Sequence, residues 1–323
     1  MIIVKNFTET DKEFKELSSI DNLVNHDSIN HPDDDKNDWE IRDKSLIRDR
    51  LLLYNNDHLI GVLYYSQGRD ENNRTCFYTL HLDPAYNNNG YRKLLYNKML
   101  DRVKLFNCNQ LHTTIYDHPN YKEHEKLLTK EKFNLVQTNR EYLCDIRKID
   151  FIKYKNLIHN LESNGIKLYD SKYEMKNWPD HYQKLEELCW IYGQDIPMPK
   201  GIKREREPFN EFIKDQNNYE KNYYAAEIIA VKDNEYIAST DLEYYPKAEP
   251  HKAWTGSLGV IKKFRRMGIA TALKIIAFQK LIEKGIYEVR TDNEENNPMY
   301  KINVALGFKP VPRSLEYMKD LSS

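Results

Sequence analysis

Apolar and polar residues alternate along two stretches of the chain in the pattern that β-hairpins require. In the first stretch, apolar runs at 50–54 and 59–65 flank a polar Asn-Asn-Asp turn. In the second, runs at 223–231 and 236–245 flank a Lys-Asp-Asn turn. Runs of β-branched and aromatic residues bounded by such turns favour strands. We therefore expect one hairpin in each half of the chain.

A long amphipathic helix is predicted after each hairpin, over 91–106 and over 269–284. Each helix follows an extended apolar segment and a short polar loop that contains a glycine. Gly90 and Gly268 occupy equivalent places in the two loops and lie 178 positions apart in the chain. A repeat of this length indicates that a whole domain has been duplicated.

The predicted order of elements in each half is strand, helices, hairpin, strand, helix, strand, helix, strand. In the second half, the last helix is expected to begin at about Pro298. This order is typical of a mixed α/β unit, and a length of 323 residues is suited to two such domains. We place the boundary near Lys148, which gives domains over 1–148 and 149–323.

Composition argues against several classes of function. The chain carries 49 basic and 50 acidic side chains, so it has no excess of cations for a nucleic-acid backbone. No apolar run approaches the ~20 residues that span a bilayer. The four cysteines are widely spaced without a C-x-x-C pair, which favours reduced thiols over disulfides or a zinc site. We expect a cytoplasmic protein that binds neither nucleic acid, membrane nor metal.

The segment 265–271, with the sequence RRMGIAT, lies between a predicted strand and the start of a predicted helix. A helix N-terminus presents unpaired N–H groups and the positive end of the helix dipole, which suit phosphate oxygens. Gly268 allows a close approach of the backbone, and Lys262 and Lys263 add positive charge. The segment is neither a Walker loop nor a G-x-G-x-x-G fingerprint, so ATP and NAD are not indicated. A glycine-capped helix beside a solvated basic loop is the alternative interpretation.

A second segment, 296–308, has the sequence NNPMYKINVALGF and follows a predicted strand over 287–291. Together with the 265–271 loop, it resembles the acetyl-CoA motifs of the GNAT superfamily. The match over 256–308 is similar to tandem-domain members with the mycothiol synthase-like architecture. The resemblance implies an α/β fold (α+β, mixed sheet) with two tandem GNAT-like acyl-CoA N-acyltransferase domains. It also implies that acetyl-CoA (coenzyme A) is the cofactor.

The resemblance further assigns residues to the cofactor. Main-chain groups of Leu258, Gly259 and Val260 are expected along the pantetheine arm, and Asn296 and Asn303 near the pantetheine and the sulfur. The pyrophosphate is expected on the residues of the loop, which are Arg265, Arg266, Met267, Gly268, Ile269, Ala270 and Thr271.

Candidate catalytic residues follow from the transfer of an acetyl group to an amine. Many family members carry a tyrosine acid where this chain has Asn303, whose amide can donate a hydrogen bond to a thiolate but cannot protonate it. Tyr300 is a substitute acid or, alternatively, a core or lid tyrosine. Strand alternation places Ser239, Asp241 and Glu243 on one face, and Glu243 is our candidate base. A solvent-facing acidic strand edge is the alternative.

The acceptor pocket of this fold is built largely from its first helices and the loop between them. In this chain, the corresponding segment contains Trp190, Tyr192 and Asp195. A carboxylate beside two aromatic rings would hold a cationic amine by charge and by cation–π contact. Alternatively, Asp195 starts a turn.

The first half departs from both motifs of the second. Asn87 stands where Arg or Gln is expected, and Arg92 stands where a small residue keeps the helix start open. Tyr121 occupies the asparagine position of the second motif, and Lys132 the glycine position. We interpret the first half as a degenerate copy that supports the second.

The leading hypothesis is an N-acetyltransferase that transfers an acetyl group directly from acetyl-CoA to a primary amine in the C-terminal domain. The expected acceptor is a small molecule, such as a polyamine-like or aminoglycoside-like amine, and the expected assembly is a monomer or homodimer. Two alternatives are a non-catalytic acyl-CoA-binding sensor and a protein N-acetyltransferase.

Overall fold

The computed structural model describes residues 1–25, 28–68, 74–87, 89–106, 108–199, 202–297 and 299–321, which form two compact units. Unit 1 comprises Met1–Asn139, Met198–Glu205 and Pro312–Ser323, and unit 2 comprises Arg140–Pro197 and Arg206–Val311. The helices that the structure describes are all too short or too polar to cross a bilayer.

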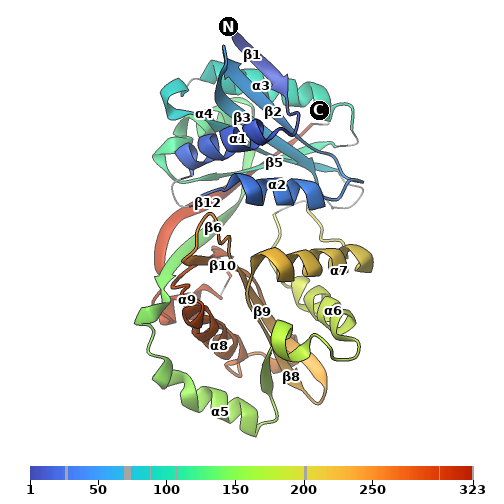
Figure 1. The fold of residues 1–323 in the computed structure, drawn as a ribbon, viewed down its shortest axis with the longest axis vertical. Helices are drawn as coiled ribbons and strands as arrows, with labels where there is room; N and C mark the ends of the chain where they lie inside the picture. The colour runs from blue at the N-terminus through green and yellow to red at the C-terminus, as the bar shows by residue number, and fades with distance from the viewer. Residues whose placement is uncertain are drawn as a thin grey trace. The chain divides into compact units, whose positions relative to one another are not determined.

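Unit 1 is a sheet with helices on both faces (Figure 1). Its strands, in spatial order, are β1 (Ile2–Asn6), β2 (Arg48–Asn55), β3 (His58–Gln67), β4 (Thr75–Leu82), β5 (Gln110–Tyr116), β12 (Lys309–Asp320) and β6 (Asn134–Asp145). The helices α1 (Asp11–Val24) and α2 (Pro32–Ile41) pack on one face, and α3 (Asn89–Val103) and α4 (Lys122–Lys130) on the other. Thr10 and Glu13 form a capping box that fixes the start of α1.

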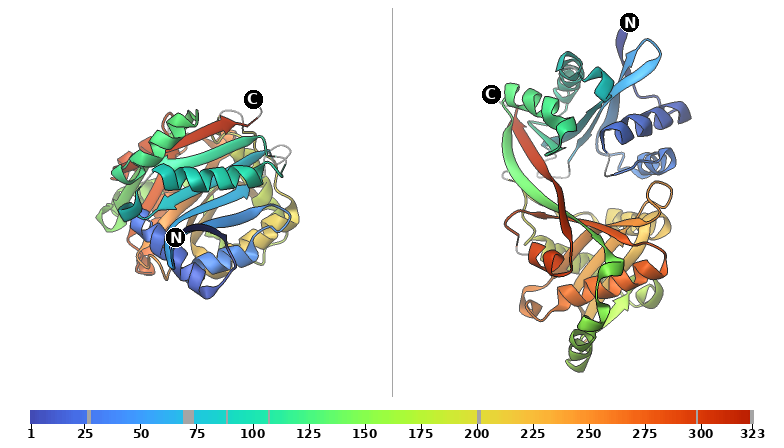
Figure 2. Two further views of the ribbon diagram at one scale, coloured as in Figure 1. Left: turned by 90° about the horizontal axis from the view of Figure 1, so that it is seen from above. Right: turned by 90° about the vertical axis from the view of Figure 1, so that its left-hand side faces the viewer.

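The last strand of the chain is part of the sheet of unit 1. There β12 lies between β5 and β6, and Figure 2 shows β12 in red and β6 in green. It is antiparallel to β5, with Ser314 opposite Tyr116 and Asp320 opposite Gln110. A hydrogen bond of 2.9 Å between His112 Nε2 and Glu316 Oε2 links the two strands.

Unit 2 repeats this plan. Its strands, in spatial order, are β12, β6, β11 (Glu288–Glu294), β10 (Lys252–Val260), β9 (Glu235–Glu243), β8 (Tyr224–Lys232) and β7 (Lys167–Asp170). Its helices are α5 (Lys155–Ser163), α6 (His181–Gly193), α7 (Phe209–Asn218), α8 (Ile269–Glu283) and α9 (Tyr300–Ala305). Both predicted hairpins and both long predicted helices are confirmed, as β2–β3, β8–β9, α3 and α8. Pro298 lies outside the described residues.

The two faces of the unit 2 sheet are covered by different helices, because successive side chains of a strand point to opposite sides. Ala226, Ile228 and Leu242 pack with α8 in one core, and Ile229 and Tyr236 pack with α6 and α7 in another (Figure 1). The face of the sheet that carries α6 and α7 is therefore separate from the face that carries α8.

Candidate active site

The strands β10 and β11 separate part-way along their length. Their parallel pairing runs from Lys252 opposite Glu288 to Trp254 opposite Arg290, and no later pair joins them within the described residues. Beyond this point, β10 continues to Val260 and keeps its pairing with β9. The backbone groups of Leu258–Val260 that face the gap therefore lack a strand partner. The Val260 carbonyl accepts a hydrogen bond from Arg265, and the other groups can hydrogen-bond an extended ligand.

The free part of β10 begins at a bulge. The register between β9 and β10 shifts between Thr255 and Leu258. At this shift, the Ser257 N–H donates a 2.9 Å hydrogen bond to Asp241 Oδ1. A Cβ atom on Gly256 would lie 1.8 Å from Asp241 Oδ2, so a larger residue there would displace the Asp241 carboxyl group. Bulges of this kind are common beside active sites, where they redirect backbone groups.

The loop after β10 has the geometry of an anion site. Arg266 has a φ of 64° and Gly268 a φ of 84°, and α8 starts at Ile269 without a side-chain cap. The first N–H groups of an uncapped helix have no partner within the helix and point along its axis. Ala270 and Thr271 in the first turn have short, half-buried side chains, and the Leu157 side chain lies against Gly268. The segment 265–271 can therefore receive a phosphate group.

The basic residues of the loop contact Asp195. Asp195 pairs with Lys262 at 3.0 Å and with Arg265, whose Nε also donates to the Val260 carbonyl at 2.8 Å. The hydrogen bonds from Lys262 and Arg265 lower the pKa of Asp195. Asp195 is exposed, and the structure places it against the loop, where it helps to hold Arg265 in place.

Tyr192 supports the free part of β10. Its buried ring lies against Gly259, where a Cβ atom would come within 2.0 Å of the ring. Its hydroxyl lies 2.9 Å from Ser257 Oγ and 3.3 Å from Ser239 Oγ. Burial raises the pKa of Tyr192 well above its ordinary value. Trp190 is half-buried, and the Arg206 guanidinium lies 5.8 Å from its ring.

Two carboxyl groups meet on the same side of the sheet as Tyr192. Glu227 on β8 lies directly opposite Asp241 on β9, and only 5% of Glu227 is exposed. Burial raises the pKa of Glu227 to about 8, and Asp241 adds to the shift while a hydrogen bond from Ser171 opposes it. Burial also raises the pKa of Asp241, against the hydrogen bonds from Ser257.

Glu227 is not among the site residues predicted from the sequence. It lies in the run 224–231, whose other members are buried aromatic or aliphatic residues, and that isolated acid was the available signal. A charged residue inside such a run needs a special environment. Glu243, our candidate base, is half-buried at the end of β9, where it lies opposite Trp254 and Tyr224.

A buried polar chain leads away from Glu227. Ser171, which hydrogen-bonds Glu227, lies 3.3 Å from His181 Nε2, and His181 Nδ1 lies 2.9 Å from the Tyr236 hydroxyl. Burial lowers the pKa of His181. A neutral histidine between two hydroxyl groups can both accept and donate a hydrogen bond, so the chain can carry a proton.

The residues of the second motif occupy different environments. Asn303 is 1% exposed, and its Nδ2 donates a 2.7 Å hydrogen bond to Asn293 Oδ1. Tyr300 is half-buried at the start of α9. Asn296 is exposed, and its side chain donates to Glu294 at 2.9 Å.

A cavity of about 1010 Å³ lies beside the segment that leads into the 265–271 loop. Its lining includes Ile191 on α6, Phe209 on α7, Tyr236 on β9, and Ile261 and Lys263 after β10. Tyr236 and Asp241 are five residues apart on one strand, a separation of roughly 16 Å. The cavity is therefore distant from the pair of carboxyl groups, and we assign it no ligand.

Comparisons with known proteins agree with this geometry. The sequence matches the acetyltransferase (GNAT) family over residues 13–128 and again over 184–305. A search of the curated proteins found no match. A tandem GNAT protein from the clavulanic acid biosynthesis pathway superposes with a TM-score of 0.78 at 15% identity, covering 100% of this chain and 99% of that one.

Two further solved structures share the fold. A GCN5-related N-acetyltransferase from Sphaerobacter thermophilus has a TM-score of 0.70 at 14% identity, covering 99% of this chain and 96% of that chain. A glucosamine N-acetyltransferase region of a fungal multi-domain GH3 β-N-acetylglucosaminidase also has a TM-score of 0.70, at 12% identity. It covers 98% of this chain and 38% of that chain. The two matched regions together span most of the sequence, so the chain belongs to the GNAT acetyltransferase family and carries its fold twice.

Proposed function

We propose that the protein is an acetyl-CoA-dependent N-acetyltransferase that acetylates a primary amine of a small molecule in unit 2. The observation that carries this proposal is the gap between β10 and β11, which leads to the uncapped loop at 265–271. An extended arm with a phosphate at its end matches a strand edge followed by a helix N-terminus. Family membership supports acyl transfer in general.

The predicted cofactor residues of β10 and of the loop at 265–271 have roles in this proposal. The backbone of Leu258, Gly259 and Val260 binds the amide groups of the pantetheine arm, because these residues lie beyond the last pair with β11. The backbone N–H groups from Arg266 to Thr271 bind the pyrophosphate. Asp195 keeps Arg265 beside the loop, so we reassign Asp195 from acceptor binding to the support of the phosphate site.

The chemistry requires a neutral amine and a proton acceptor. Acetyl-CoA supplies a thioester, whose carbonyl carbon forms the new C–N bond while its C–S bond breaks. The proton of the ammonium group passes to the pair formed by Glu227 and Asp241, which lies beside the β10 bulge. A backbone N–H of β10 stabilises the charge that develops on the carbonyl oxygen. The thiolate takes a proton from Tyr300, because the Asn303 amide has no proton of suitable acidity to give. The nitrogen loses a second proton as the amide forms, and this proton returns to Tyr300.

Binding of the acceptor follows from the same side chains. Two neighbouring carboxyl groups on one face attract a cationic amine, and Tyr192 positions the strand that they touch. Trp190 offers an aromatic surface near the end of α6. Both carboxyl groups are at least partly enclosed, which favours a small amine over an extended protein segment.

The experiment is a calorimetric titration of acetyl-CoA into the wild type and into Ala270→Asp. The new carboxylate lies in the first turn of α8, where it favours the helix but repels a phosphate. We expect one equivalent of acetyl-CoA to bind the wild type. The variant should bind acetyl-CoA at least roughly tenfold more weakly. Gly268 is unsuitable for this test, because a Cβ atom would lie 2.5 Å from Leu157 Cδ1.

Asn210→Asp is the matched control. It makes the same change of charge at an exposed position in the first turn of α7. Its affinity for acetyl-CoA should equal that of the wild type. If the wild type binds no acetyl-CoA, or if Ala270→Asp binds as tightly as the control, the proposed site is wrong. Failure of the wild type to turn over acetyl-CoA with any amine, despite binding, would instead favour a sensor.

A further inference from the structure

Unit 1 has a gap between strands that resembles the one in unit 2. The parallel pairs of β4 and β5 run from Thr75 opposite Gln110 to Tyr78 opposite Thr113, whereas β4 continues to Leu82 and β5 to Tyr116. The helices α3 and α4 pack against each other on one face of this sheet. Their side chains determine what the gap can receive.

Arg92 from the first turn of α3 is buried, and two of its three side-chain nitrogens lack a hydrogen-bond acceptor within the part of the chain that the structure describes. Only 3% of the residue is exposed, and its Nε and Nη1 atoms have no hydrogen-bond acceptor among the described residues. Burial lowers the pKa of Arg92 to about 10, so the guanidinium is still charged at neutral pH. A buried cation whose N–H groups lack acceptors is strongly unfavourable.

His124 from α4 is also a buried side chain whose polar atoms lack hydrogen-bond partners among the residues described. It is 2% exposed, and neither ring nitrogen has a partner in the described part of the chain. Burial, together with the charges of Arg92 and His81, lowers the pKa of His124 to about 3. The ring also lies 6.1 Å from that of Tyr78, at the last pair of β4 and β5.

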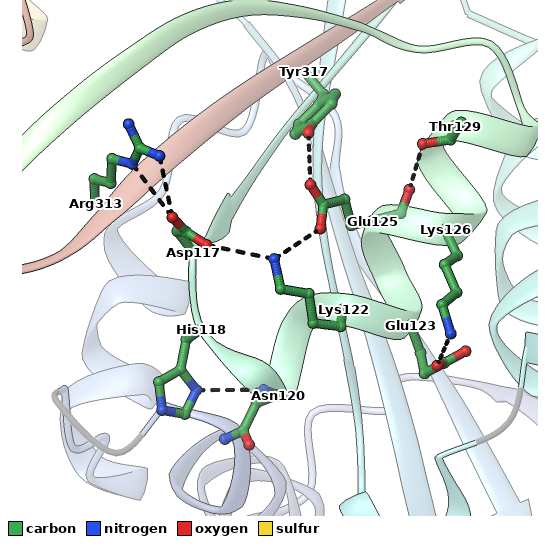
Figure 3. A network of polar contacts seen from close by, with 10 residues as sticks. All are labelled: Asp117, His118, Asn120, Lys122, Glu123, Glu125, Lys126, Thr129, Arg313 and Tyr317. Carbon is green, nitrogen blue, oxygen red and sulfur yellow. Dashed lines mark hydrogen bonds and ion pairs between the residues drawn. The ribbon is translucent and has the colours of Figure 1, made fainter.

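The nearby carboxylates are engaged with other residues. Glu123, the acid that acts on the charge of Arg92, accepts a 2.6 Å hydrogen bond from Lys126, as Figure 3 shows. Asp21 accepts hydrogen bonds from His81, Tyr64 and Asn30 at 2.6–2.8 Å. An external acceptor would therefore satisfy Arg92 and His124 better than either of these acids.

We propose that unit 1 holds an oxyanion, a carboxylate or phosphate group, between Arg92 and His124. The guanidinium supplies the positive charge and two N–H donors, and the neutral imidazole supplies a further N–H. The start of α3 adds the positive end of a helix dipole. Because both side chains are enclosed, the site takes a small anion or the terminal group of a larger molecule.

This inference does not depend on the proposed function of unit 2. In unit 2, Ala270 stands at the position equivalent to Arg92, and the phosphate site there is made of backbone N–H groups. In unit 1, a side chain provides the donors, so the degenerate copy retains a different binding function. The oxyanion comes either from a free small anion or from a phosphate of coenzyme A.

The test measures thermal stability and the NMR signals of the His124 ring in the full chain, with inorganic phosphate, acetate and coenzyme A as separate probes. All proteins carry Ala270→Asp, which weakens the binding of coenzyme A at the loop of unit 2, and the His124 signals report on unit 1. We expect at least one probe to raise the melting temperature by several degrees and to shift the His124 signals to saturation. A response to phosphate or acetate indicates a free anion, and a response to coenzyme A alone indicates its phosphate.

Arg92→Met separates binding from structure. Removal of an uncompensated buried charge should leave the melting temperature of the free protein unchanged or higher, and should abolish the response to the probe. Arg102→Met on the same helix is the control, because Arg102 pairs with Asp49 at 2.7 Å. It should lower the melting temperature slightly and keep the response. The proposal is overturned if no probe acts on the parent protein, or if Arg92→Met responds as the parent does.

Discussion

Glu227 and Asp241 face each other across neighbouring strands, with both carboxyl groups on the side of the sheet that carries α6. Two like charges at this spacing in a buried place resist joint ionisation, so one carboxyl retains its proton to higher pH than an isolated acid. Glu227 is the more buried of the two, and its pKa rises to about 8. This relationship is the basis for two of the predictions below.

Glu227 should determine the pH dependence of acetyl transfer. The carboxylate accepts a proton only when it is ionised, so kcat/KM should rise as pH increases through about 8. Glu227→Gln should lower kcat by roughly 10²–10⁴-fold and remove this rise. Initial rates over a pH series will measure both effects. Glu235→Gln, at an exposed position, is the control. If the rise in kcat/KM with pH is lost in Glu243→Gln but retained in Glu227→Gln, the base is Glu243 instead.

The same carboxyl should make the folded state less stable as pH increases. Above its ordinary value of 4.5, the carboxyl is ionised in the unfolded chain, whereas the folded protein keeps the proton until about 8. The folded state therefore binds more protons in this window, and its stability falls as pH rises, by up to a few kcal/mol. Urea unfolding at the two ends of the window will show this loss, and Glu227→Gln should reduce it. Equal pH dependence in both proteins would contradict the shift.

Gly259 and Tyr192 should be strongly coupled. Gly259→Ala places a methyl group into the Tyr192 ring, and overpacking of this kind costs about 1–3 kcal/mol. In a Tyr192→Ala background the space is open, so the same substitution should cost much less. A double-mutant cycle of unfolding free energies measures the difference. Additive effects would show that the ring does not contact Gly259 in solution.

Tyr300 and Asn303 should affect different properties. Tyr300→Phe removes the proposed acid and should lower kcat by roughly 10–100-fold, with no change in affinity for acetyl-CoA. Asn303→Ala leaves Asn293 without its hydrogen-bond donor and should lower the unfolding free energy by about 1–3 kcal/mol. Single-turnover rates and urea unfolding of both variants test the distinction. An unchanged kcat in Tyr300→Phe would leave Tyr300 as a core or lid residue.

Local sequence signals were sufficient for the elements and for the glycine-containing loop at 265–271. The hairpin over β8 and β9 has a polar turn between two apolar runs, and α8 has one apolar face, so both could be recognised within a few residues. Gly268 could be selected because a strand–glycine–helix order has a backbone consequence, and the structure shows its φ of 84°. These features depend on residues that are neighbours in the chain.

Features that depend on residues distant in sequence could be decided only by the tertiary structure. Glu227 and Asp241 are adjacent because of the register between β8 and β9, and a shift of one residue would place them on opposite faces. The sequence identified Arg92 as a long side chain at a helix start, but its burial depends on how α3 packs against α4. The pairing of β12 with β5 joins segments that no local pattern connects. Backbone propensity acts over neighbouring residues, whereas burial, strand register and the fields of nearby charges are properties of the packed molecule.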